Sequence, residues 1–351
     1  MAVTRDPLRW PYPWNSIWNY PLGDAARLVP LNMVIPTERT LNVEEDIIVA
    51  DPDAPLVPIV RHDAAWNDGE TRCGEQLDGD LITPGVPIPP GFVTDPGYWG
   101  VKPNHATAIV MADLTLFETQ PLHICPDGTV VSEYTNERWQ GDSILTGGMG
   151  GEPDGGAHGG SFMTAFGGTI RLGEWVPGGA IRHAIKVDLD SGANLSTVGG
   201  GFRWPALVAD SGYLAGYAGS ISEARMGSLL ALAPDFDVAA LATEPARILA
   251  TTLARYGAYV VDGSGWSTAM FATEWGPDGR VIDEFEREWG YPLAGHRPLV
   301  TGSQAEFLGD IETIYANLQI VDDNAPGNVG GSGDRLAPWA PSFSDGTGSH
   351  P

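Results

Sequence analysis

The chain has 351 residues, with 19 Lys or Arg against 45 Asp or Glu, so its formal net charge at pH 7 is −26. A surface this acidic repels nucleic acid and anionic lipid, and because no basic patch is visible we expect no nucleic-acid partner. No apolar stretch is long enough to cross a bilayer, so we expect no membrane insertion. Neutral polymers, cations and basic proteins remain as ligands, and the acidity also fits a solubility trait without any ligand.

Residues 1–25 are rich in aromatic residues and proline. The aromatic residues are Trp10, Tyr12, Trp14, Trp18 and Tyr20. Aromatic rings stack on the C–H faces of sugars and also dominate protein interfaces. We therefore expect an N-terminal arm that either offers an aromatic platform or packs on the protein's own core.

Residues 26–320 are predicted to form one large, mainly β domain. Apolar, β-branched runs bounded by Pro, Gly, Asp or Asn predict short strands at 47–50, 56–60, 108–112, 129–132 and 181–189. The 46 glycines and 29 prolines favour many turns and long loops. We expect a β-sandwich or a barrel-like fold.

About two short helices are expected within this domain. Thr243 is a candidate N-cap, with Pro245 in the first turn and Gly257 as the stop. Ser303 and Glu306 have the spacing of a capping box before a second apolar stripe.

Residues 321–351 have the Gly- and Pro-rich composition of a tail. Chain ends of this kind become ordered only when something holds them. A symmetric oligomer can clamp such a segment between its subunits. We therefore expect a homo-oligomer in which Trp339 or Phe343, with part of the arm, is buried against another chain or against the same chain's core.

Cys73 and Cys125 are the only cysteines. Two cysteines do not make a zinc site on their own, and they could form one disulfide or remain as two buried thiols. Because both lie beside turn-forming residues, we expect the disulfide. No other pattern indicates a metal site, and we expect no metal and no cofactor.

The stretch from Gly147 to Gly179 is the densest in glycine. An ordered chain tolerates so much glycine where the backbone adopts left-handed angles or approaches another group closely. Apolar residues within the stretch would be left exposed in a flexible linker, which favours an ordered segment. We expect residues 147–174 to line the main cleft, although ordered turns without chemistry would look the same.

Glycoside hydrolysis needs two carboxyl groups, one protonated and one ionised. The candidates are Glu174 beside Trp175, Asp210, Asp262, and Glu274 beside Trp275. Aromatic neighbours stack on sugars and raise the pKa of a carboxyl group. Each of these acids taken alone could equally be a solvated or hydrogen-bonded structural residue.

His158 and His183 are candidate general bases. His158 lies between glycine-rich segments, whereas His183 alternates with apolar residues and fits a hydrogen-bonded core histidine better. The candidate glycan-binding residues are Arg171, Trp175, Trp204 and Trp275.

A series of motifs carries a family resemblance. In order, they are Asn-Ser-Ile-Trp-Asn at 15–19, Ala-His-Gly-Gly-Ser at 157–161, Gly-Gly-Thr-Ile-Arg-Leu-Gly-Glu at 167–174, Ile-Arg-His-Ala-Ile-Lys-Val at 181–187, Arg-Trp-Pro-Ala at 203–206, Arg-Met-Gly-Ser-Leu-Leu-Ala-Leu at 225–232 and Tyr-Gly-Ala-Tyr-Val-Val-Asp at 256–262. Over nearly its whole length the chain resembles actinobacterial phage minor tail proteins and related secreted proteins of bacteria that degrade polysaccharides.

The resemblance implies a place but no reaction, because no catalytic residues come with it. It implies a virion tail protein that contacts host cell-wall glycan and other virion tail proteins. The start of the chain shows no secretory signal pattern, which favours the virion over an extracellular location. The alternative is a glycoside hydrolase, or another polysaccharide-cleaving enzyme, that acts on bacterial or environmental glycans.

Overall fold

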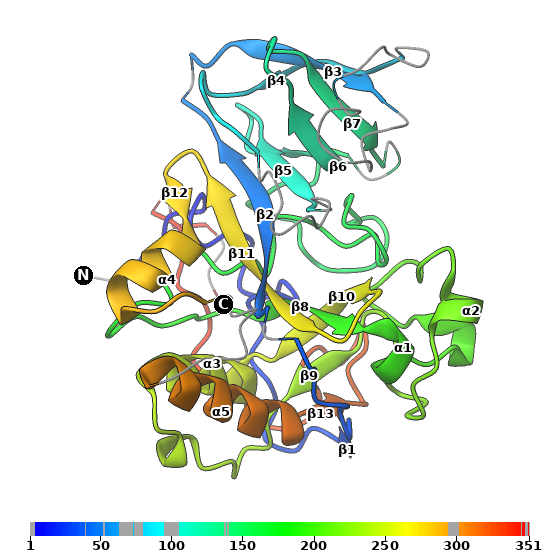
Figure 1. Ribbon diagram of the computed structural model, residues 1–351, viewed down its shortest axis with the longest axis vertical. Helices are drawn as coiled ribbons and strands as arrows, with labels where there is room; N and C mark the ends of the chain where they lie inside the picture. Colours follow the sequence, from blue (N-terminus) through cyan, green and yellow to red (C-terminus); the bar gives the residue numbers. More distant parts are fainter. Residues whose placement is uncertain are drawn as a thin grey trace.

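The structure is a computed structural model. It describes residues 4–38, 40–51, 53–62, 73, 80–94, 105–136, 138, 140–293, 302–344, 346–347 and 350. The chain is mainly β, as its sequence predicts (Figure 1). The strands are β1 (Leu28–Pro30), β2 (Asn42–Val49), β3 (Leu56–Arg61), β4 (Leu81–Pro87), β5 (Thr107–Val110), β6 (Leu116–Ile124), β7 (Val130–Tyr134), β8 (Ile185–Asp190), β9 (Leu229–Ala231), β10 (Ala258–Ser264), β11 (Ala269–Gly276), β12 (Gly279–Arg280) and β13 (Gln319–Val321).

Among the described residues, these 13 strands form one mixed, hydrogen-bonded series in the order β1-β13-β9-β10-β8-β11-β2-β5-β6-β7-β3-β4, and β12 pairs with β11. Each of the five strand ranges expected from the sequence overlaps an observed strand, because β-branched apolar runs suit a buried, pleated surface. In the middle of the series, β8 pairs in parallel with β10 and antiparallel with β11, which pairs in parallel with β2.

Five α-helices are present in the described residues: α1 (Ser191–Asn194), α2 (Tyr213–Gly216), α3 (Glu244–Arg255), α4 (Val281–Trp289) and α5 (Ser303–Ala316). Two 3-10 helices lie at Val198–Gly201 and Val238–Ala240. Figure 1 shows α3 and α5 together on one side of the strands β8 to β13. The two helices expected from the sequence are therefore present.

The details of helix capping differ from the expectation. Thr243 is the N-cap of α3, but its hydroxyl donates to the Asp310 carboxylate at 2.7 Å rather than accepting a bond from its own helix. The N-cap of α5 is Gly302, at a φ of 62°, so Ser303 lies inside the helix. The capping box expected at Ser303 and Glu306 is wrong by one residue, since glycine adopts this left-handed angle at little cost.

The apolar residues form two buried clusters. The larger cluster joins β8, β9, β10 and β11 to α3 and α5, with members such as Trp18, Trp175 and Phe307. The smaller cluster includes Ile48, Ile59 and Leu122 and fills the lobe built from β3 to β7, at the top of Figure 1. The two clusters meet at β2 and β5, which contribute residues to both.

The N-terminal arm and the C-terminal tail pack against each other within one chain. The Arg5 backbone N–H donates to the Ser342 carbonyl at 3.0 Å, and its guanidinium lies 4.0 Å from the centre of the Phe343 ring. The Trp339 ring makes edge contacts with Trp14 and Tyr20, each at 4.9 Å between ring centres. Phe343 is buried against the same chain, which is one of the two outcomes expected.

The glycine-rich part of the tail is also held by its own chain. The Gly330 N–H donates to the Asn324 side chain at 2.9 Å, and the Gly330 carbonyl accepts from Gly23 at 3.0 Å. The Arg335 guanidinium donates to the Gly331 and Gly333 carbonyls. The premise that only neighbouring subunits can order this segment is therefore wrong, and a homo-oligomer stays a prediction without that support.

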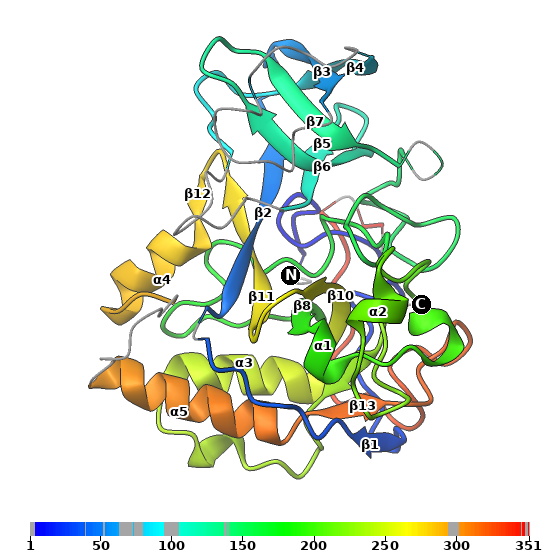
Figure 2. The same ribbon diagram turned by 45° about the vertical axis from the view of Figure 1, so that its right-hand side comes forward.

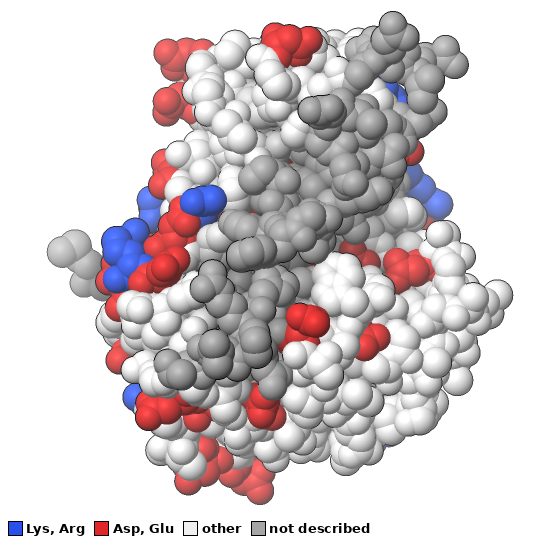
Figure 3. All heavy atoms as spheres, viewed as in Figure 1, with Lys and Arg blue, Asp and Glu red and all other residues white. Residues whose placement is uncertain are grey.

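Cys73 and Cys125 form the expected disulfide, with their Cα atoms 5.6 Å apart. Acidic side chains are spread over the face seen in Figure 3, where basic side chains are fewer. None of the described helices combines the length and the apolar character needed to cross a membrane.

Candidate active site

A cavity of about 470 Å³ opens beside the glycine-rich stretch. Its lining residues are Gln120, Tyr134, Gly159, Gly160, Phe162, Val208, Ala209, Asp210, Ser211 and Asp262. They come from β6, β7, the glycine-rich stretch, the segment before α2, and β10. Figure 2 shows α1 and α2 close to the ends of β8 and β10. The sequence prediction that the stretch is ordered and lines a cleft is confirmed.

Local hydrogen bonds fold the stretch back on itself at this cavity. The Gly156 N–H donates to the Phe162 carbonyl at 2.8 Å, and the His158 N–H donates to the Met163 carbonyl at 3.1 Å. Gly160, at the tip, has a φ of 75°. A side chain is disfavoured at this angle, which accounts for glycine at this position.

Gly160 also marks where two carboxylates approach each other. A Cβ atom built on Gly160 would lie 2.5 Å from one Asp262 oxygen and 3.1 Å from one Asp210 oxygen. These two distances limit the separation of the two oxygens to 5.6 Å at most. Two of the acids selected from the sequence therefore form a close pair at one cavity.

A β-bulge positions Asp262. In the parallel pairing of β10 with β8, Val260 lies opposite Val187 and Asp262 lies opposite Asp188, so Val261 is an extra residue. A bulge redirects the side chains that follow it and is frequent beside active sites. It places the Asp262 carboxyl group beside Asp188 and towards the cavity.

Three acids share this region, and each has a raised pKa. Burial, followed by the charges of Asp188 and Asp210, raises the pKa of Asp262 well above its ordinary value. Burial raises the pKa of Asp188 to about 7. Burial also raises the pKa of Asp210, but a hydrogen bond from the Tyr217 hydroxyl, at 2.6 Å, stabilises its ionised form. Asp262 is therefore the better proton holder of the cavity pair, and Asp210 is the better anion.

Behind the acids lies a buried ionic group. The His158 Nε2 donates to the Glu45 carboxylate at 2.8 Å, and the Lys186 ammonium lies 3.6 Å from the other Glu45 oxygen. Burial lowers the pKa of His158, but the charge and hydrogen bond of Glu45 outweigh it and raise the pKa to about 9. His158 is therefore a cation at neutral pH and does not serve as a general base there.

Two residues of β6 anchor the glycine-rich stretch. The Glu118 carboxylate accepts from the backbone N–H groups of Ala157 at 2.9 Å and Ala165 at 3.1 Å, and from the Thr164 hydroxyl. The Gln120 side-chain carbonyl accepts from the Gly159 N–H. Neither residue was a sequence candidate, because only the fold brings β6 to the stretch.

The remaining candidate acids lie elsewhere. Glu174 pairs with His183 at 3.1 Å, and the Arg171 guanidinium binds Glu274 through Nε at 3.0 Å and Nη2 at 3.2 Å. None of these four residues lines the 470 Å³ cavity. Glu174, Glu274 and His183 are therefore not brought together with Asp210 and Asp262. Burial lowers the pKa of His183, but Glu174 outweighs it and raises it.

The three candidate tryptophans have structural contacts. Trp175 is 1% exposed and donates to the Pro245 carbonyl, and Trp275 is 7% exposed and donates to the Val93 carbonyl. Their ring faces are covered by protein, so neither offers a platform to a sugar. Trp204 is half-buried and donates to the Gly150 carbonyl at 3.2 Å, outside the cavity lining.

Among the described residues, one group brings three possible metal-ligand atoms within 4.8 Å of one another: Cys73, His123 and Cys125. Both sulfur atoms belong to the disulfide, so they do not act as thiolate ligands in this state.

Comparison of the chain with known proteins found no matching family model, no matching curated protein and no matching solved structure.

Proposed function

We propose that the chain is a glycoside hydrolase that cleaves a neutral polysaccharide in the 470 Å³ cavity. The observation that carries this proposal is the pair of carboxyl groups of Asp210 and Asp262, whose nearest oxygens lie within 5.6 Å across the tip of the glycine-rich stretch. Their surroundings differ in the way that acid–base hydrolysis requires, with Asp262 held protonated and Asp210 stabilised as an anion.

Each acid then has one role. Asp262 donates its proton to the leaving glycosidic oxygen, while the Asp210 carboxylate attacks the anomeric carbon and forms a glycosyl ester. Water, deprotonated by Asp262, then cleaves the ester and releases the sugar. Carboxyl groups of retaining enzymes stand about 5–5.5 Å apart, against about 6.5–9.5 Å in inverting enzymes. The close approach of Asp210 and Asp262 therefore favours retention of configuration.

The cavity wall suits a sugar ring. Phe162 and Tyr134 both line it, half-buried, with ring centres 6.1 Å apart. Phe162 has a φ of 55°, an angle that costs a residue with a side chain about 1–3 kcal/mol. Aromatic faces bind the C–H faces of sugars, and this cost supports a role for the Phe162 ring at the cavity.

We place this activity at the actinobacterial cell wall, with the protein carried on a phage tail. The resemblance of the sequence motifs to phage minor tail proteins supports this location, and a net charge of −26 favours a neutral substrate over an anionic one. A secreted enzyme of a polysaccharide-degrading bacterium would use the same site.

Incubation of the purified chain with actinobacterial cell-wall polysaccharide tests the reaction. We expect release of reducing sugars with initial retention of the anomeric configuration, detected by NMR. The Asp262→Asn and Asp210→Asn variants should each lower the rate at least 100-fold, because each removes one of the two required groups. The rate should fall at low pH, where Asp210 is protonated, and at high pH, where Asp262 is ionised.

The matched control is Asp235→Asn, at an exposed acid outside the cavity lining. It should retain the wild-type rate. Activity that survives both Asp262→Asn and Asp210→Asn, or a folded wild type that releases no sugar, contradicts the proposal.

A further inference from the structure

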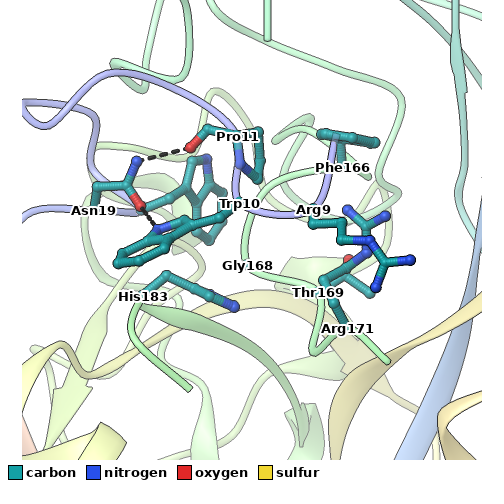
Figure 4. Close-up of a pocket in the computed structure, with 10 residues that line it drawn as sticks. Arg9, Trp10, Pro11, Asn19, Phe166, Gly168, Thr169, Arg171 and His183 are labelled. Carbon is teal, nitrogen blue, oxygen red and sulfur yellow. Dashed lines mark hydrogen bonds between the residues drawn. The ribbon is translucent and has the colours of Figure 1, made fainter. Parts of the chain in front are cut away.

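A second cavity, of about 220 Å³, shares no lining residue with the candidate active site. Arg9 and Arg171 line it, together with Asp6, Asp278 and Leu172. The same two arginines also line an adjoining space of about 10 Å³, which Figure 4 shows in close-up.

Arg171 has an unused donor group. Its Nε and Nη2 atoms bind the Glu274 carboxylate, which leaves Nη1 on the far side of the guanidinium. Nη1 is buried and has no hydrogen-bond partner among the described residues, and the side chain is only 7% exposed. Buried polar groups almost always have a partner, so this donor indicates a ligand or an ordered water.

Arg9 supplies a second set of donors. It is exposed, and within the described part of the chain its guanidinium forms no ion pair. Figure 4 shows the guanidinium groups of Arg9 and Arg171 extending to the same side of the pocket. Two like charges at one pocket repel each other unless acceptor atoms lie between them.

The acids of this cavity define the ligand further. Asp6 and Asp278 are exposed carboxylates on its wall, and Glu274 lines it as well. Three carboxylates against two guanidinium groups leave the lining with a net negative charge, which disfavours a sulfate or phosphate group. A sugar hydroxyl can accept from an arginine and donate to an aspartate at the same time. Leu172 offers an apolar wall to the ring carbons.

We propose that this cavity is a second glycan-binding site, which holds one neutral sugar unit through Arg9, Arg171 and Asp278 without cleaving it. The inference rests on the proposed function, since it takes the same polysaccharide as ligand. A binding site apart from the acids would hold the polymer while the cavity of Asp210 and Asp262 acts on it.

Co-sedimentation with insoluble actinobacterial cell-wall polysaccharide is the test. The Arg9→Ala/Asp278→Ala double variant changes only exposed side chains and leaves the buried pair of Arg171 and Glu274 in place. We expect its affinity for the polysaccharide to fall at least fivefold, whereas the rate on a short soluble fragment stays at the wild-type value. The matched control is Arg287→Ala, at an exposed arginine whose ion pairs are with Glu284 and Glu288.

The outcomes separate the two proposals. Unchanged binding by the double variant, absence of binding by the wild type, an equal loss in Arg287→Ala, or displacement by glucuronate but not by a neutral oligosaccharide from the same polysaccharide overturns this inference. Binding that depends on Arg9 and Asp278 without any hydrolysis supports the second site and contradicts the proposed function alone.

Discussion

His158 should make the stability of the protein depend on pH. Its imidazole is buried, 2.8 Å from the Glu45 carboxylate, and its pKa is raised from 6.5 to about 9. Lys186 and Asp188 are the other charged groups that act on it. Replacement of His158 by Gln keeps a hydrogen-bonding side chain but removes the proton that titrates.

The sign follows from linkage. Because the pKa is higher in the folded state, the contribution of the charged imidazole is fully present below pH 6.5 and is lost as the pH rises through about 9. One pKa unit corresponds to about 1.36 kcal/mol, so the contribution is about 3 kcal/mol. His158→Gln should therefore destabilise the protein most at pH 6, and its deficit relative to the wild type should shrink by about 3 kcal/mol at pH 9.5.

Urea unfolding of both proteins between pH 6 and pH 9.5, followed by tryptophan fluorescence, measures this deficit. The comparison cancels the titration of groups such as Asp188, which lowers stability as the pH rises from 3.8 through about 7 in both proteins. Asp235→Asn, at an exposed acid, should show a pH-independent difference from the wild type. A deficit of His158→Gln that stays constant over this range refutes the reasoning.

Two further predictions concern the fold. A Cβ at Gly168 would lie 2.3 Å from the Trp18 ring, whereas a Cβ at Gly173 would meet nothing within 4 Å, and both glycines have φ near 80°. Ala at either position should cost about 1–2 kcal/mol for the backbone angle, but Gly168→Ala should cost about 1–3 kcal/mol more in urea unfolding, and equal costs would contradict the packing. The Cys73–Cys125 bridge closes a separation of 52 residues, so Cys125→Ser should lower stability by roughly 3–4 kcal/mol, and an unchanged unfolding midpoint would contradict a disulfide in solution.

The parts of the fold that the sequence could predict are those with local causes. The apolar, β-branched runs of β2, β3, β5, β7 and β8 identify strands, because their side chains favour an extended, buried backbone. The apolar stripe of α3 identifies a helix for a similar reason. The left-handed Gly302, which moves the start of α5, has no comparable local pattern.

The candidate site was predictable by residue type but not by arrangement. Asp210 and Asp262 were selected as acids, yet nothing near them in the sequence separates them from Glu174, which the fold pairs with His183. Their meeting depends on the parallel pairing of β10 with β8 and on one extra residue in β10. Such a register is set by contacts distant in the sequence.

Glu45 shows why the buried ions could not be found from the sequence. It stands in Asn-Val-Glu-Glu-Asp, a run that looks like a solvated edge, yet it is fully buried because β2 lies between β11 and β5. A buried carboxylate is tolerated only with opposite charges, and His158 and Lys186 supply them from the glycine-rich stretch and β8. The ionic group that fixes the base of the glycine-rich stretch therefore depends on three segments that only the folded sheet brings together. For that reason we expect a change at Glu45 to affect the cavity as well as the core.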